Sequence, residues 1–174
     1  MRVRNALQAL IFLSLGLLIA GPASAQDVTV IGTHGAWTAY SYQEDSGIVC
    51  YIASEPTKAE GNYTRRGYVF ALVTHRPSEN SIDVVSIVAG YPYQENSDVT
   101  VRLGTKSFEL FTHGERAWTR DESSDKDLVN SMVRGSSMIV KGTSGRGTLT
   151  TDSYSLNGFT AARKEISDAC KTGG

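Results

Sequence analysis

The chain has 174 residues, and its 17 lysines and arginines nearly balance its 18 aspartates and glutamates, giving a formal net charge of -1. This balance argues against a nucleic-acid-binding protein held by a basic face and against an acidic disordered tail. An apolar fraction of 40% suffices for one packed core, while only two cysteines exclude a disulfide-dense miniprotein and a four-thiolate zinc site. Composition by itself indicates no reaction.

The first 25 residues have the pattern of a secretory signal peptide. Arg2 and Arg4 precede a mostly apolar run over 6–20, which a Gly-Pro break separates from Ala23-Ser24-Ala25. The pattern predicts cleavage before Gln26. An uncleaved membrane anchor is disfavoured, because about 15 apolar residues are fewer than the roughly 20 that span a bilayer core.

We therefore expect one exported domain over residues 26–174, with 149 residues, a net charge of -3 and no transmembrane segment. Its predicted location is the periplasm, the outer membrane or the space outside the cell. In such an oxidising compartment the two cysteines, Cys50 and Cys170, are expected to form a disulfide. The alternative, a catalytic thiol with a His partner, is disfavoured because Cys170 lies four residues from the chain end.

Short runs rich in Val, Ile, Thr and aromatic residues predict a mainly β domain. The predicted strands cover residues 28–31, 36–42, 48–54, 68–75, 82–89, 99–103, 107–111, 117–119 and 138–141, with a further strand around Leu149. Residues 99–103 alternate apolar and polar side chains, as a half-buried strand requires. Residues 68–73 are apolar almost throughout, which predicts a central strand covered on both faces.

Two segments follow a helical period instead. Residues 124–127 supply a cap and an acidic first turn for a helix that ends before Gly135. A second helix, beginning near Asn157, places Phe159, Ala162 and Ile166 on one stripe and leads to Cys170. These elements predict an antiparallel β-sandwich or barrel-like domain with two short helices in the C-terminal half.

Patterns of catalytic or metal-binding residues are scarce. The three histidines, His34, His75 and His113, are scattered and belong to no known ligand motif. The sequence therefore predicts no catalytic set, metal or cofactor. Trp37 and Trp118 are expected to pack in the core or against the sheet.

Basic residues near glycines are the candidate ligand contacts. Residues 142–148, with three glycines around Arg146, match neither a P-loop nor a nucleophile elbow, and a tight turn is favoured over an anion site. The pairs Arg65-Arg66 and His75-Arg76 are further candidates for contact with an acidic ligand, although short charge pairs are commonly solvated.

Several motifs together resemble the invasion-associated locus B protein family of alphaproteobacteria. They are residues 35–38 (Gly-Ala-Trp-Thr), 50–54 (Cys-Tyr-Ile-Ala-Ser), 74–77 (Thr-His-Arg-Pro), the glycine-rich run 142–148, and 154–162, which is similar to the family's S-L-x-G-F-x-x-A ending. The resemblance covers most of the chain after residue 37. Many members carry an additional cysteine shortly after the first Trp, whereas residues 38–42 hold none here, so a different disulfide arrangement is expected.

The resemblance implies export and an association with host-cell invasion in some members, without an established activity or site. We therefore expect a non-enzymatic binding or envelope-interaction protein whose partner is an unidentified protein or an envelope or host surface. One alternative is an envelope enzyme in which Ser144 or Ser155 meets a His only in the fold. A second is a structural or chaperone-like factor for the outer membrane.

Overall fold

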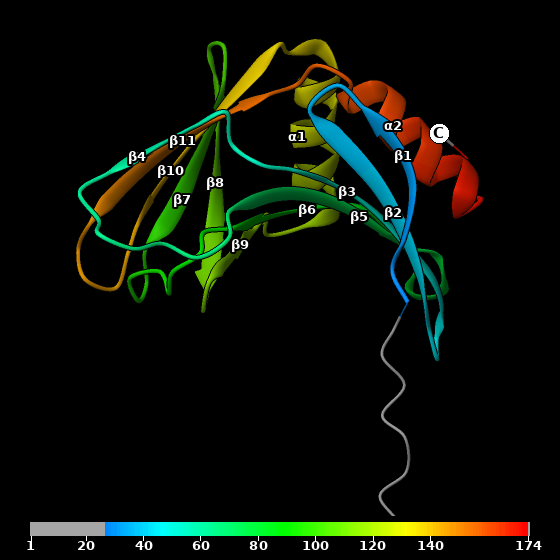
Figure 1. The fold of residues 1–174 in the computed structure, drawn as a ribbon, viewed down its shortest axis with the longest axis horizontal. Helices are drawn as coiled ribbons and strands as arrows, with labels where there is room; N and C mark the ends of the chain where they lie inside the picture. Colours follow the sequence, from blue (N-terminus) through cyan, green and yellow to red (C-terminus); the bar gives the residue numbers. More distant parts are fainter. Residues whose placement is uncertain (1–26, 174) are drawn as a thin grey trace, which may run out of the picture.

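A computed structural model describes residues 27–173, so the predicted signal peptide lies outside the described residues. Its strands form one antiparallel sheet in the order β1-β2-β3-β5-β6-β9-β8-β7-β10-β11-β4 (Figure 1). The strands are β1 (Thr29–His34), β2 (Trp37–Glu44), β3 (Gly47–Ser54), β4 (Lys58–Gly61), β5 (Phe70–Arg76), β6 (Ser81–Val88), β7 (Asp98–Leu103), β8 (Lys106–His113), β9 (Arg116–Trp118), β10 (Ser137–Thr143) and β11 (Leu149–Ser155). A 3-10 turn, η1 (Pro77–Glu79), joins β5 to β6.

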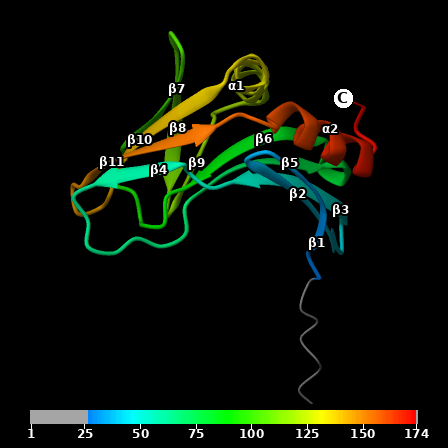
Figure 2. The same cartoon turned by 45° about the horizontal axis from the view of Figure 1, so that its top comes forward.

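Two helices complete the domain, and Figure 2 shows both on the same side of the sheet. Helix α1 (Glu122–Arg134) begins earlier than predicted, because Asp121 is its cap and accepts a 2.8 Å hydrogen bond from the Ser124 amide. Helix α2 (Phe159–Ala169) follows Gly158, which is in the left-handed conformation. Neither helix is long and apolar enough to cross a membrane, and residues 27–173 contain no other candidate span.

The prediction of a mainly β antiparallel domain with two helices in the C-terminal half is confirmed. The sheet is a single curved layer that does not close into a barrel (Figure 1). Its two halves are tied where β2 approaches β11. There the Ala36 amide donates to the Asn157 carbonyl at 3.0 Å, and the Trp37 indole N–H donates to the Ser155 carbonyl at 2.9 Å.

The core lies between the sheet and the two helices. Trp37 of β2 is fully buried and meets Phe159 of α2 edge-to-face, with ring centroids 5.0 Å apart. Leu128 and Met132 of α1 are buried in the same cluster as Val85 of β6. The buried stripe predicted for α2, formed by Phe159, Ala162 and Ile166, is therefore confirmed.

One expectation about the strands is wrong, and one strand was not predicted. Strand β5 is covered on one face only: Ala71 and Val73 are fully buried beneath the helices, whereas Phe70 and Leu72 are half-buried on the opposite face. Strand β4 was not predicted, because all four of its side chains are exposed and it carries no apolar alternation. It pairs with β11 at the edge of the sheet.

Candidate functional site

Three loops at the lower left of Figure 1 surround a cleft of about 760 Å³, which we call the loop cleft. The loops connect β4 to β5, β6 to β7, and β10 to β11, and the turn between β8 and β9 adds Glu115 to the lining. The lining residues are Asn62, Tyr63, Thr64, Arg65, Gly90, Tyr91, Pro92, Glu115, Ser144, Gly145, Arg146, Thr148 and Thr150. The structure thus brings two of the predicted ligand contacts, Arg65 and Arg146, into one cavity.

Arg66 anchors the first of these loops from below. Its guanidinium donates two 2.6 Å hydrogen bonds to the Asp152 carboxylate and a third, also 2.6 Å, to the Ala89 carbonyl. Both charged side chains are almost completely buried. Burial disfavours the charged form of Arg66, but the hydrogen bonds and charge of Asp152 outweigh it and raise the pKa of Arg66. The charge of Arg66 is therefore matched within the protein.

Arg65 and Arg146, in contrast, are exposed. Within residues 27–173 neither guanidinium has an ion-pair partner. One carboxylate, that of the exposed residue Glu115, lines the same cleft. The side chains of the loop cleft therefore carry a net positive charge.

The turn around Arg146 uses its own amides. Ser144 N–H donates to the Thr148 carbonyl at 2.9 Å, Gly147 N–H to the Ser144 carbonyl at 2.7 Å, and Thr148 N–H to the Ser144 hydroxyl at 3.1 Å. Gly145 N–H donates across the cleft wall to the Pro92 carbonyl at 2.8 Å. These bonds support the predicted tight turn. Because the amides of Ser144, Gly145, Gly147 and Thr148 are bonded within the protein, the group of this turn that could contact an anion through its charge is the Arg146 guanidinium.

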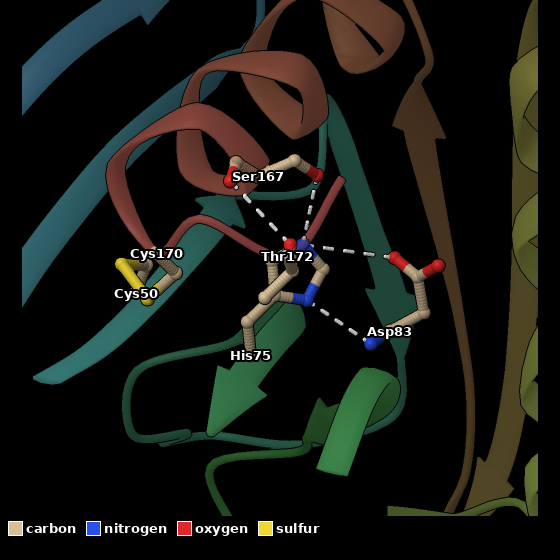
Figure 3. Close-up of a disulfide and its surroundings, with 6 residues drawn as sticks. All are labelled: Cys50, His75, Asp83, Ser167, Cys170 and Thr172. Carbon is tan, nitrogen blue, oxygen red and sulfur yellow. Dashed lines mark hydrogen bonds and ion pairs between the residues drawn. A yellow bond between two sulfur atoms is a disulfide. The ribbon is translucent and has the colours of Figure 1, made fainter. Parts of the chain in front are cut away.

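The pair His75-Arg76 lies elsewhere, at the end of β5, and Figure 3 shows His75 there. Arg76 donates to the Tyr42 hydroxyl at 3.2 Å and pairs with Glu44 at 3.5 Å. The His75 ring is fully buried and faces Ser167 of α2 and Asp83 of β6. Of the predicted contacts, Arg65 and Arg146 are the two whose guanidiniums are exposed and have no ion-pair partner within residues 27–173.

The surroundings of His75 determine which of its nitrogens carries the proton. The Asp83 amide donates to Nδ1 at 3.0 Å, so in the neutral ring Nε2 bears the hydrogen and donates to the Ser167 hydroxyl 3.1 Å away. Burial lowers the pKa of His75, the Asp83 carboxylate opposes this shift, and Arg163 adds to it. Although Ser, His and Asp are adjacent, the ring does not accept the serine proton as a general base would.

Within the described residues, the hydroxyl groups of the two serines named as nucleophiles have only backbone amides as hydrogen-bond partners. Ser144 accepts from the Thr148 amide, and Ser155 accepts from the Asn157 amide at 3.2 Å. No His or carboxylate is among these partners. This geometry lends no support to the serine-hydrolase alternative.

The predicted disulfide is confirmed. Cys50 of β3 is bonded to Cys170, directly after α2, with the two Cα atoms 6.0 Å apart (Figure 3). Both cysteines are buried, and neither is free. The bond fastens the end of the last helix to the sheet.

A second surface was not predicted: the side of the sheet that faces away from the helices. Residues paired across antiparallel strands share a face, and neighbours along a strand alternate between faces. Trp37 and Ala39 point to the helices, so Tyr40 points away from them and stacks on its cross-strand partner Tyr51 at 4.9 Å. The aromatic face consists of Tyr40, Tyr42, Tyr51, Tyr68, Phe70, Leu72, Val84, Val88, Phe111 and Trp118.

The aromatic face is apolar and accessible. Tyr68 is 82% exposed, and the other members are half-buried. In the described residues of β2, β3, β5 and β6, this side bears one ion pair, Glu44 with Arg76 at its rim. The sequence contained a signal for this face, namely the apolar run of β5, which predicted coverage on both sides. Neither described helix covers this side of the strand (Figure 2).

The fold defines a disulfide-bonded, mainly β domain with one aromatic sheet face and one basic cleft. Comparison with family models places it more closely: the model described as Invasion associated locus B (IalB) protein matches residues 37–167. The chain belongs to this family, which is associated with invasion. No curated protein and no solved structure matches the chain significantly.

Two of the motifs that carry the family resemblance, residues 35–38 and 154–162, meet at one structural junction. Gly158 has φ +87°, and a Cβ there would overlap the His34 carbonyl. Next to it, Phe159 packs on Trp37. These residues join α2 to β1 and β2, so the two motifs fix the position of α2 on the sheet.

Proposed function

We propose that the chain is an exported, non-enzymatic binding protein that contacts an envelope or host-surface partner through the aromatic face. The proposal extends the family's association with invasion to a physical role for this molecule. The observation that carries it is the uncovered, nearly uncharged side of β2, β3, β5 and β6.

The composition of this face is that of a protein-binding surface. Monomeric soluble proteins rarely leave a large contiguous apolar surface in water, and interface cores are rich in Tyr, Trp and Phe and poor in charge. Tyr68 is a particularly informative member, because an 82% exposed aromatic ring gains little from folding. A partner that covers Tyr68 and Tyr40 would bury the apolar surface that these rings leave accessible in the folded chain.

Two independent features support export. Residues 1–25 have the charge, apolar run and small-residue site of a signal peptide. The disulfide between Cys50 and Cys170 is of the kind that persists in oxidising compartments and is rare in a reducing cytosol.

A deletion strain tests the proposal when it is complemented with defined variants. Wild type should restore host-cell invasion, whereas a chain lacking residues 2–25 should stay in the cytosolic fraction and fail. The double variant Tyr68→Ser, Tyr40→Ser should be exported but fail to restore invasion. The matched control is Val133→Ser, which removes a 39% exposed apolar side chain from α1 and should behave as wild type.

Envelope integrity is measured in the same strains by detergent sensitivity. If the deletion leaves invasion normal and weakens the envelope, the protein is a structural factor of the outer membrane and the proposed role is wrong. If the Tyr68, Tyr40 variant restores invasion fully, the aromatic face is not the contact surface.

A further inference from the structure

We propose that the loop cleft binds an anionic sugar residue, one that carries a phosphate or a carboxylate, with Arg65 and Arg146 as the groups that hold the anion. The inference rests on the proposed binding function and adds a second site to it, at a different place from the aromatic face. Three properties of the cleft carry it: its charge, its rigidity and its lining.

The charge of the cleft selects for an anion. Arg65 and Arg146 reach it from separate loops, and neither is neutralised by an ion pair within residues 27–173. Guanidinium groups bind phosphate and carboxylate oxygens through charge-assisted, often bidentate hydrogen bonds. Arg66, the neighbour of Arg65, is already saturated by Asp152 and Ala89, so these two exposed arginines are the free cations of the site.

The cleft is preformed, because its loops are bonded to one another. Gly67 N–H donates to the Gly90 carbonyl at 2.8 Å, which joins the first loop to the second. Gly145 N–H donates to the Pro92 carbonyl, which joins the second loop to the third. The Tyr91 hydroxyl is 2.6 Å from that of Thr150 on β11. A ligand therefore orders little of the protein when it binds, which lowers the free-energy cost of association.

The rest of the lining suits a polar body of sugar size. Tyr63, Tyr91 and Pro92 provide apolar surface, while Asn62, Ser144 and Thr148 provide amide and hydroxyl groups. The volume of about 760 Å³ lies within the range of small-molecule sites and far exceeds that of an inorganic anion. An inorganic ion alone would leave most of this volume to solvent.

Isothermal titration calorimetry on the purified protein with its disulfide intact tests the inference. The probes are glucose 6-phosphate, glucuronate, glucose and inorganic phosphate. The two anionic sugars should bind at least about ten-fold more tightly than glucose, because charge-assisted hydrogen bonds are stronger than neutral ones. Glucose 6-phosphate should also bind more tightly than inorganic phosphate, which lacks the sugar body.

Variants assign the binding to the cleft. Arg65→Gln and Arg146→Gln should each weaken binding of the anionic sugars by about ten-fold or more. Arg134→Gln, at the end of α1, removes an exposed arginine far from these loops and should bind as wild type. All three positions are exposed, so the variants should fold normally.

Several results would overturn the inference: no binding of either anionic sugar at millimolar concentration, equal affinity for glucose, equal affinity for inorganic phosphate, or cleft variants that match wild type. None of these results would contradict the proposed role of the aromatic face, because Tyr68 and Tyr40 are unchanged in all of these variants. Conversely, normal invasion by the Tyr68, Tyr40 variant would leave sugar binding measurable in solution.

Discussion

His75 links the stability of the domain to pH. The ring is fully buried and neutral, and burial lowers its pKa, whereas in the unfolded chain it titrates near 6.5. Between these two pKa values the unfolded chain binds more protons than the folded one. The contribution of His75 is therefore complete above about pH 6.5 and is lost as the pH falls toward the folded pKa.

We expect the free energy of unfolding of wild type to fall on acidification from pH 7 to 5, with His75 contributing at most about 1.4 kcal/mol per pH unit. His75→Gln should lower stability at pH 7 and flatten this dependence, and His113→Gln, at an exposed position, should keep it. Urea unfolding at several pH values provides the measurement. If the His75→Gln and wild-type curves are parallel, the ring does not titrate as described.

Gly158 tests the junction of the family motifs. Gly158→Ala introduces both a strained positive φ and an overlap with the His34 carbonyl, so it should destabilise the protein by at least about 2 kcal/mol. Gly147→Ala is the matched control, because Gly147 has φ +81° and its Cβ would meet no atom within 4 Å. Thermal unfolding should rank the two variants in this order. Equal losses would show that the overlap is relieved at no cost.

Individual candidate residues could be chosen from the sequence only in part. Arg65 and Arg66 are adjacent and chemically identical, yet one is exposed and the other is matched by Asp152, 86 positions away. Likewise, nothing near His75 in the sequence indicates its contact with Ser167. Such partners are set by strand pairing across the whole sheet, which a local pattern does not contain.

Helix α2 depends on Phe159 for its attachment. This ring is 1% exposed and packs against Trp37, so Phe159→Ala should cost about 3 to 5 kcal/mol of unfolding free energy through lost burial and a cavity. Val133→Ala on α1 is the control, and its exposed side chain should change stability by less than about 0.5 kcal/mol. A negligible shift for Phe159→Ala in urea unfolding would contradict the position of the ring.

The disulfide fixes the other end of α2. Peptide mass spectrometry of the exported protein without reductant should find the Cys50 and Cys170 peptides joined. The double variant Cys50→Ser, Cys170→Ser should lose up to about 5 kcal/mol, because the bond closes a long loop in the unfolded chain. Recovery of both cysteines as free, alkylated thiols from the envelope fraction would show that the bond does not form in the cell.

The predictable elements are those in which apolar residues recur with the period of the strand or helix and are the residues that become buried. Strands such as β7 alternate cleanly, and α2 shows a single apolar stripe, so both could be predicted. Strand β4 could not, since an exposed edge strand needs no apolar side chain. The apolar run of β5 predicts coverage on both faces because its side chains are apolar on both. The sequence does not show that the helices cover only one of these faces.

At the scale of the whole molecule, the open sheet separates two surfaces with different chemistry. The aromatic face spans β2, β3, β5 and β6 and continues onto β9 and β8 through Trp118 and Phe111, while the loop cleft lies at the end of β10 and β11. The disulfide and the Gly158 junction hold α2 on the opposite side from the aromatic face. The proposed partner and the proposed anionic sugar would therefore bind at separate places on the domain.

Photocrosslinking in living cells tests the contact surface most directly. A photoreactive phenylalanine analogue replaces Tyr68 on the aromatic face or, as the control, Val133 on α1; the cells are irradiated, and their envelope fraction is analysed for adducts. Because Tyr68 is exposed in the isolated chain and covered in the proposed complex, we expect a discrete adduct at position 68 and none at position 133. Equal labelling at both positions, or no adduct at 68 in a correctly exported chain, would contradict the account.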